Sequence, residues 1–375
     1  MMSRVLALFV VLWSVAAAAA TLQGGSSRRL APRSAVPPDS SSAQSKLYFD
    51  QQAAKTRRAE VERTLLLPGV ELLEEVLKAQ SGSGFGAGTS SKDKAKQLCA
   101  ALRENGVIRV NHCIKDSTAS SLKEHVLEEM ESARALISSG QQPPRAMLNS
   151  EPERKSRTDF KLSLKRREGK DSKHPVADAL NEMFGDGGSL RALYDSLLGP
   201  ESELYDLGCM TTFPGSDRQT IHADFAYQSE PPMFAIFVAL QDVTACMGPT
   251  VFLPRTNTAK DCNEWKSAST YDAYLHSKVP SDALLKRGDL VIYDPRTLHC
   301  GAANLEEGGS SRSLFNVGFL NPKVSGDFGY QGSLRAAYGN GKITFGRLTN
   351  SLRGYKSGGK KDPFDAYGHG LETTC

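Results

Sequence analysis

Hydrophobic and polar positions follow different periods in the two halves of the chain. In the first half, apolar residues recur every three to four positions over residues 116–137, 175–184 and 189–198, a spacing that predicts amphipathic helices. A shorter helix is expected at residues 98–102, followed by a first strand at residues 106–110. The first half is therefore expected to be mainly helical.

The second half consists of short β-branched or aromatic runs separated by Gly, Pro, Asp and Asn. Such runs are typical of strands joined by tight turns. They cover residues 204–213, 234–240, 250–253, 290–293 and 313–320. Helices followed by many short strands predict an α+β fold with a mainly β core, built as a closed or sandwiched sheet.

The pattern also divides the chain into segments. Residues 1–20 combine a short positive start, an apolar run and a stretch of alanines, which predicts a cleavable signal peptide and not a membrane anchor. Residues 21–91 form a transit-like, disordered segment with a short helical stretch and a Gly/Ser linker. We expect the main folded domain at residues 92–325 and a Gly-, Lys- and Arg-rich, partly disordered tail at residues 326–375.

The N-terminal segments bear on localisation. A signal peptide followed by a transit-like segment predicts entry into the secretory pathway, with plastid import by bipartite targeting or an ER or secreted fate as open alternatives. The seven cysteines are odd in number and match no metal-binding spacing, so we interpret them as thiols. Free thiols weakly favour a reducing compartment.

Composition narrows the classes of partner. The formal net charge of +4 is small for 375 residues, and 39% hydrophobic residues suffice for a core. There is no stripe of Lys and Arg interleaved with aromatic residues and no finger or helix-turn-helix pattern, so we expect no nucleic-acid partner. We expect a small-molecule substrate and no stable membrane anchor, whereas the pattern predicts no particular oligomeric state.

The most informative polar residues are two histidines and an aspartate. On an extended strand, residues two apart point to the same side, so His222 and Asp224 can reach one ion while Ala223 points away. His299 follows the buried strand at residues 290–293, where the chain emerges after a kink. Two histidines and one carboxylate can hold a mononuclear non-haem Fe(II). For an isolated His–Asp pair, a structural hydrogen bond is the alternative.

An arginine adds to this set. Residues 306–311 predict a hairpin turn, which places Arg312 on a return strand beside His299. A guanidinium there can bind a carboxylate through two parallel hydrogen bonds. Gln219 and Thr250 are further candidates for the pocket, with ordinary strand hydrogen bonding as their alternative role.

Residues 157–162 precede the strand-rich half and are also candidates for the mouth of the site. Arg157 and Lys161 share a face if this segment is helical, whereas Arg157 and Asp159 share a face if it is extended. A surface segment with ion pairs is the alternative to a substrate contact.

Together these blocks resemble the phytanoyl-CoA dioxygenase family of Fe(II)/2-oxoglutarate oxygenases. The resemblance extends over about residues 98–322. Each matching block is moderately specific alone, and the order of the blocks along the chain makes the set more specific. The matching blocks are residues 102–110, 214–224, 238–243, 247–254 and 288–299, followed by Arg312. The fold that it implies is a double-stranded β-helix, a cupin-type jelly roll, flanked by N-terminal helices.

The resemblance implies roles for individual residues. His222, Asp224 and His299 would bind Fe(II), and Arg312 would bind the distal carboxylate of 2-oxoglutarate, with O2 as the second co-substrate and ascorbate as a supporting reductant. The carboxylate at Asp224 favours hydroxylation with release of succinate and CO2, because halogenating relatives have a small residue at this position. Residues 92–325 would then be the catalytic domain.

The chain departs from the family pattern in two places. Pro254 is followed by Arg255-Thr256-Asn257, where the family commonly has Gly and then His. Gly301 stands two residues after the third ligand, where some members have Ser that contacts the co-substrate. These departures concern the cradle of 2-oxoglutarate and leave the metal triad intact.

Two alternatives come from other classes of function. A cupin-type protein could bind a metal or ligand without turnover, but such a protein needs no carboxylate-binding arginine at position 312. A cupin enzyme that uses no 2-oxoacid usually recruits three or four histidines, and this chain has seven in total, two of them in the triad.

Overall fold

The computed structural model describes residues 91–141, 156–164, 166, 174–267, 269–324, 343–359 and 362–365. The expected signal peptide and nearly all of the expected transit-like segment and linker, at residues 1–90, lie outside the described residues.

The described helices confirm the three longest predictions and add elements that the pattern did not show. The helices are α4 (Ser91–Asn105), α5 (Asp116–Ser138), α6 (Pro175–Phe184), α7 (Arg191–Leu197), α8 (Ala259–Lys266), α9 (Tyr271–His276) and α10 (Phe345–Ser351). α4 begins seven residues before the predicted start, because its first two turns are polar and carry no apolar repeat. Within the described ranges, no helix is long and apolar enough to cross a membrane.

The five strands predicted in the second half are present within a few residues of their expected bounds. The strands are β1 (Val107–Val110), β2 (Arg157–Lys161), β3 (Glu203–Thr212), β4 (Met233–Ala239), β5 (Thr250–Phe252), β6 (Ser281–Asp282), β7 (Leu290–Tyr293), β8 (His299–Gly301) and β9 (Arg312–Leu320). The segment for which helix and strand were both open is therefore extended, as β2, and Arg157 and Asp159 share a face.

The strands form two antiparallel sheets. The larger has the order β1-β7-β4-β9-β3-β2 and the smaller the order β6-β5-β8. His222 pairs antiparallel with His299, so the segment before β4 continues the smaller sheet beyond β8. Four strands of the larger sheet, β7-β4-β9-β3, thus face four segments of the smaller sheet, which are the segment at His222, β5, β6 and β8. This is the connectivity of a double-stranded β-helix, and it confirms the predicted fold.

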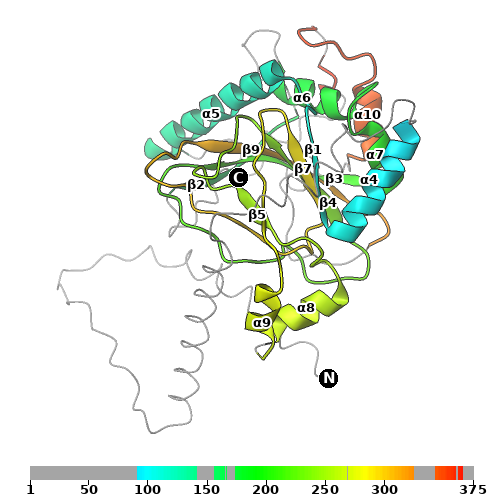
Figure 1. Cartoon of the computed structure of the whole chain (residues 1–375). Coiled ribbons are helices and arrows are strands. Elements are labelled where there is room, and N and C mark those ends of the chain that lie inside the picture. Colours follow the sequence, from blue (N-terminus) through cyan, green and yellow to red (C-terminus); the bar gives the residue numbers. More distant parts are fainter. Residues whose placement is uncertain are drawn as a thin grey trace, which may run out of the picture. The chain divides into compact units, whose positions relative to one another are not determined.

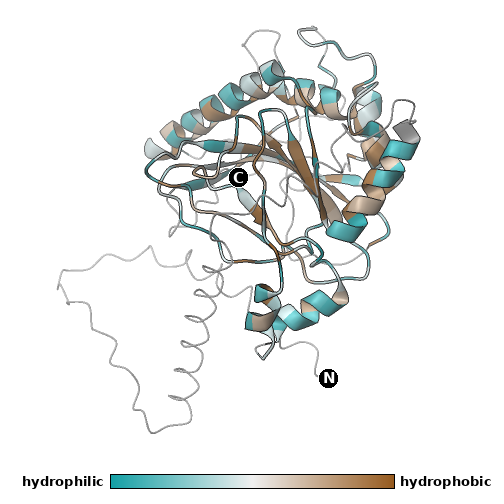
Figure 2. Ribbon diagram, viewed as in Figure 1, coloured by the Kyte–Doolittle hydropathy of each residue, from teal (hydrophilic) through white to brown (hydrophobic). Residues whose placement is uncertain are grey.

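Helices cover one face of the larger sheet, which positions the site on the other. The main hydrophobic cluster joins α5, α6, α7 and α10 to the side chains on one face of β3, β4, β7 and β9. Figure 1 shows these helices on the same side of the sheet, with α8 and α9 apart from them near β5. The strands are mostly apolar, whereas the outer sides of the helices are polar (Figure 2). A second cluster, including Phe237, Val291 and Tyr293, lies on the opposite face.

The C-terminal segment contains a helix that the apolar pattern did not show. We expected a partly disordered tail at residues 326–375, and within this segment α10 belongs to the main hydrophobic cluster. Phe345 and Leu348 are fully buried, because they lie on one face of α10 and fill the space above the sheet. The ring of Phe345 lies edge-on to Phe184 and Phe319, with centroids 5.4 Å apart in each pair. Short length and flanking glycines hid this helix in the sequence.

Candidate functional site

His222, Asp224 and His299 converge on one point between the two sheets. The backbones of His222 and His299 exchange two hydrogen bonds, of 2.9 and 2.8 Å, so the pairing of distant segments fixes both histidines. Both Nε2 atoms lie 3.6 Å from Oδ1 of Asp224. One potential ligand atom from each residue lies within 4.8 Å of the other two. The structure therefore brings the predicted triad together.

The remaining polar atoms of the triad are oriented by neighbours. Nδ1 of His222 lies 2.8 Å from the carbonyl oxygen of Thr220, and Nδ1 of His299 lies 3.0 Å from that of Thr297. Because a carbonyl only accepts, each Nδ1 carries the hydrogen and each Nε2 keeps its lone pair for a metal. On Asp224, Oδ2 accepts a hydrogen bond of 3.0 Å from the hydroxyl of Tyr293, which leaves Oδ1 facing the histidines.

The electrostatics of the triad suit a divalent cation. Burial disfavours the imidazolium form and lowers the pKa of His299, although the Asp224 carboxylate partly offsets this effect. For Asp224, removal from water opposes ionisation, but His299, His222 and Tyr293 outweigh it and lower the pKa. The site therefore favours a neutral imidazole at His299 and a carboxylate at Asp224, and with His222 these residues are the donor set that Fe(II) takes in 2-His-1-carboxylate sites.

Arg312, at the start of β9, lines the same cavity as the triad. Its side chain is 1% exposed, and Nη1 donates to the carbonyl oxygen of Gly248. Its Nε has no hydrogen-bond partner among the described residues. Burial and the neighbouring charge of Arg157 lower the pKa of Arg312 to about 9. A buried guanidinium with an unsatisfied donor favours an anionic ligand, because a carboxylate would satisfy both the charge and the free N–H.

A cavity of about 310 Å³ connects these groups. Its lining includes the triad, Arg312, Gln219 and Thr250, so the structure places all six predicted site residues around one space. Gln219 is also tied to β8, because its Oε1 accepts a 2.9 Å hydrogen bond from the backbone N–H of Gly301. Thr250 pairs with Gly301 across β5 and β8. For both residues, strand hydrogen bonding is thus observed alongside a position on the cavity.

The sequence comparison agrees with this geometry. The family model described as phytanoyl-CoA dioxygenase (PhyH) matches residues 102–313, which is more than half of the 375 residues and includes the triad and Arg312. The chain belongs to the phytanoyl-CoA dioxygenase family. Fe(II), 2-oxoglutarate and O2 are the cofactor and co-substrates of this family, so the chain is an Fe(II)/2-oxoglutarate-dependent enzyme. No curated protein sequence matches it significantly.

The chain is also similar, at low identity, to solved structures of other enzymes. The alpha-ketoglutarate-dependent carbocyclase SnoK from nogalamycin biosynthesis is 15% identical, with a TM-score of 0.45 over 63% of this chain and 87% of that chain. The epimerase SnoN from the same biosynthesis is 16% identical, with a TM-score of 0.43 over 67% and 98%. HygX from Streptomyces hygroscopicus, with nickel, 2-oxoglutarate and hygromycin B bound, is 12% identical, with a TM-score of 0.41 over 61% and 88%.

The structure gives a physical reason for one departure from the phytanoyl-CoA dioxygenase pattern. A Cβ atom on Gly301 would lie 2.8 Å from Nη2 of Arg157 and 2.8 Å from Oε1 of Gln219. The space that a serine side chain occupies in some family members is therefore filled here by Arg157. Since Arg157 lies in register with Thr212, which in turn pairs with Arg312, three strands bring the two arginines to one end of the cavity.

Other functional residues were missed in the sequence. Tyr293, the hydrogen-bond donor to Asp224, was hidden in a continuous apolar strand. Asp206 and Asn316 line the cavity from β3 and β9, within runs that otherwise read as core. The polar residues themselves were the available indication, because a charge or amide inside a buried strand requires a partner.

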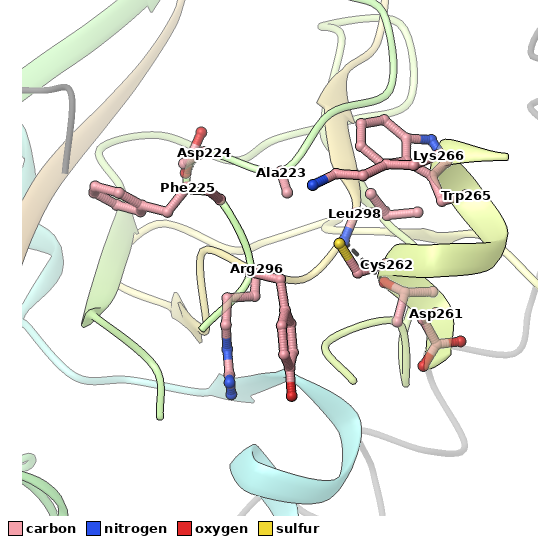
Figure 3. A pocket seen from close by; sticks show the side chains of 12 residues that line it. Ala223, Asp224, Phe225, Asp261, Cys262, Trp265, Lys266, Arg296 and Leu298 are labelled. Atoms are coloured by element: carbon pink, nitrogen blue, oxygen red, sulfur yellow. Dashed lines mark hydrogen bonds between the residues drawn. The ribbon is translucent and has the colours of Figure 1, made fainter. Parts of the chain in front are cut away.

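A second, smaller cavity of about 190 Å³ lies beside Asp224. Figure 3 shows Asp224 and Phe225 at one end of it and Cys262, Trp265 and Lys266 of α8 at the other. Arg296 lies between them, held by a 2.6 Å ion pair with Asp294. This cavity contains none of the other metal-ligand candidates, so the chemistry of the family belongs to the larger cavity.

Proposed function

We propose that this enzyme hydroxylates a small organic or lipid-like metabolite, with 2-oxoglutarate as co-substrate and release of succinate and CO2. The observation that carries the proposal is the carboxylate at position 224. Its Oδ1 lies 3.6 Å from the Nε2 atoms of both histidines, in a cavity that also contains a buried arginine. Support for hydroxylation over other oxidations comes from the residue type at this position.

His222, Asp224 and His299 would hold Fe(II) from one side. Bound with 2-oxoglutarate and O2, the iron supplies an oxidation that converts a substrate C–H bond into C–OH. The chain's own contribution is orientation: the carbonyls of Thr220 and Thr297 keep each imidazole turned toward the ion, and Tyr293 fixes the carboxylate.

Arg312 would bind the distal carboxylate of 2-oxoglutarate. Its charge is buried, and the low local polarity strengthens an ion pair made there. The carbonyl oxygen of Gly248 already holds one end of the guanidinium, so the free Nε is presented in a fixed direction. A non-catalytic binding protein has no need of such a carboxylate site beside a metal triad.

Asp224 separates hydroxylation from halogenation. A halide must occupy a coordination position, which a small residue at position 224 would leave open. Here the carboxylate would fill that position, and its lowered pKa favours the ionised form. We therefore expect the product to carry a hydroxyl group and no halogen.

The test uses the full chain, because α10 is part of the core. With Fe(II), ascorbate and 2-oxoglutarate, the protein should form succinate, slowly without substrate and faster with compounds found by an untargeted metabolite screen. His222→Ala should abolish turnover, and Arg312→Ala should raise the 2-oxoglutarate concentration needed at least tenfold. His276→Ala is a matched control, since His276 is exposed at the end of α9 and should leave turnover unchanged. Folded, metallated protein that releases no succinate with any compound contradicts the proposal.

A further inference from the structure

The smaller cavity lies on the other side of the segment that carries Asp224. Ala223 lines this cavity and His222 lines the larger one, while Asp224 and Phe225 contribute to both. Because alternate residues of an extended segment point to opposite sides, the backbone of this segment separates the triad from the smaller cavity. The backbone N–H of Asp224 donates a 2.9 Å hydrogen bond to the carbonyl oxygen of Pro295, which fixes this wall. A ligand in the smaller cavity would therefore occupy a place distinct from the substrate site.

One face of α8 supplies the outer side of the smaller cavity. Trp265 and Lys266 follow Cys262 by three and four residues, so the three side chains lie on the same face of the helix. In Figure 3 the side chain of Lys266 extends from α8 toward Ala223, and the sulfur of Cys262 points toward Leu298. The helix thus presents an ammonium group, an aromatic ring and a thiol to one space.

The two carboxylates that line this cavity are engaged elsewhere. Asp261 forms a 2.7 Å ion pair with Lys278. It also accepts hydrogen bonds from the hydroxyls of Thr258 and Tyr274. The oxygens of Asp224 face the triad histidines and a tyrosine hydroxyl on the other side of the wall. Neither carboxylate is therefore available to a further cation.

The two cations that line the cavity differ in how their charges are balanced. Arg296 forms a 2.6 Å ion pair with Asp294. Its Nη1 also donates to the carbonyl oxygens of Gln228 and Ser229, at 2.6 and 3.0 Å. Arg296 is therefore a fixed and neutralised part of the wall. Lys266 is exposed, and the carboxylates of the lining have other partners, so its ammonium group is available to an anionic ligand.

The remaining surface of the cavity is mostly apolar. It includes the rings of Phe225, Tyr227 and Trp265 and the side chains of Ala223 and Leu298. The volume of the cavity is about 190 Å³. A protein cavity of roughly 150 Å³ can hold benzene, so this one has room for a single aromatic ring with a short polar group. Aromatic rings also pack favourably against one another.

We propose that the smaller cavity is a second ligand-binding site, which takes a small aromatic carboxylate. The carboxylate would pair with Lys266, and the ring would pack against the aromatic side chains of the cavity. The charge of such a ligand complements the ammonium group, and its ring matches the size and the apolar character of the remaining surface. The inference goes beyond the proposed function, since this ligand is neither the 2-oxo acid nor the hydroxylated substrate.

Trp265 gives a direct measure of binding. The chain has two tryptophans, and the other, Trp13, lies in the expected signal peptide. In the full chain with Trp13→Phe, the fluorescence of Trp265 is followed while benzoate is added. The protein contains Fe(II) and saturating 2-oxoglutarate without O2, so that the larger cavity is occupied. We expect saturable binding that does not change when more 2-oxoglutarate is added. No saturable binding, or displacement of benzoate by 2-oxoglutarate, would overturn the proposal.

Two comparison compounds separate the contribution of the charge from that of the ring. Benzamide has the ring without the charge, and it should bind about fivefold more weakly than benzoate, as expected for an exposed ion pair. Acetate has the charge without the ring, and it should bind at least about tenfold more weakly, because it buries little apolar surface. Equal affinities of benzoate and either comparison compound would reject the proposed ligand class.

Variants of Lys266 test its role. Lys266→Gln removes the charge, so it should weaken benzoate binding about fivefold and leave benzamide binding unchanged. Lys266→Arg keeps the charge and should retain most of the affinity. Lys260→Gln is the matched control, because Lys260 is exposed on the same helix and pairs with Glu264 at 3.8 Å. If Lys266→Gln weakened both compounds equally, the role of Lys266 would be structural and the proposal would be wrong.

Cys262 provides an independent readout of the same site. Bound benzoate should slow the reaction of iodoacetamide with Cys262, with the concentration dependence found by fluorescence. Cys246 is the internal control, since it is also a half-buried thiol but does not line this cavity, and its rate should not change. Mass spectrometry of the two peptides measures both rates. An unchanged rate at Cys262 would mean that benzoate binds elsewhere. These measurements need no turnover, so their outcome is independent of whether the protein hydroxylates a substrate.

Discussion

Asp224 shows how one side chain depends on a residue 69 positions away in the chain. Its two oxygens have different partners: Oδ1 faces both histidines, and Oδ2 accepts from Tyr293. Without the hydroxyl, the carboxylate could rotate and present either oxygen. Tyr293 therefore acts on the triad as a positioning residue.

Tyr293→Phe tests this role. The phenyl ring preserves packing against Phe237 and Phe252, while the loss of the hydroxyl removes a hydrogen bond that lowers the pKa of Asp224. We expect Fe(II) affinity to fall about tenfold, as for other residues that orient metal ligands, and to fall further at low pH as Asp224 takes up a proton more easily. Anaerobic metal titration measures both effects.

The control for that variant is Tyr274→Phe. Tyr274 is also buried and donates to a carboxylate, that of Asp261, but it lies on α9 away from the triad. It should leave metal affinity unchanged. Equal losses in the two variants would mean that the effect reports stability and not orientation.

At this scale the sequence predicted the residues whose roles depend on local spacing. His222 and Asp224 share a side because they are two apart on an extended segment, and a turn placed Arg312 near His299. Tyr293 and Asn316 were not predicted, because their positions on the cavity follow from cross-strand register and not from near neighbours.

Among the elements, the turn before β7 sets where this strand begins, and the chain continues from β7 to His299 on β8. Gly288 has φ +81°, and a Cβ there would lie 2.3 Å from the carbonyl oxygen of Ile114. The same turn is tied to the N-terminal region by hydrogen bonds from Cys113 and Ile114 to the Gly288 carbonyl oxygen. Glycine is therefore required twice, by the backbone conformation and by the close approach.

Gly288→Ala should destabilise the protein by more than the cost of the backbone conformation. Left-handed backbone costs about 1–2 kcal/mol for a residue with a Cβ, and the clash with Ile114 adds to it. Gly354→Ala separates the two effects, since Gly354 has φ +69° and no atom within 4 Å of the added Cβ. Chemical denaturation should show a larger loss at position 288. A loss equal to that at position 354 would mean that the chain moves away at little cost.

Prediction at the level of elements succeeded where an apolar repeat was present. The five predicted strands and the helices α5 and α6 have clear periods, whereas α8 buries only Asp261 within its bounds and β6 is two residues long. Such elements have no apolar repeat of their own, and they form because the surrounding fold positions them. β2 was open between helix and strand, because five residues with alternating charge fit both patterns until β3 supplies the pairing.

For the molecule as a whole, helices on one face of the larger sheet leave the other face for the cavity. α10 contributes to that covering from a segment far beyond the last strand. Phe345 lies against Phe184, Tyr194 and Phe319, so residues from three parts of the chain share one aromatic cluster. We therefore expect α10 and the β core to unfold together.

Phe345→Ala tests this expectation. Removal of a fully buried phenylalanine should lower the free energy of unfolding by about 3–5 kcal/mol and leave a single transition. Arg353→Ala, at an exposed position just after α10, should change it by less than about 0.5 kcal/mol. Calorimetry distinguishes the outcomes: an unchanged main transition in Phe345→Ala would show that α10 is a dispensable attachment.

The position of α10 also has a consequence for biosynthesis. A ribosome makes all strands of the β-helix before it reaches Phe345, and until then the aromatic rings of Phe184 and Phe319 lack one of their neighbours. The nascent chain therefore exposes an apolar surface that only the later segment with α10 can cover. We expect the core to be completed after release from the ribosome, with chaperones binding this apolar surface until then.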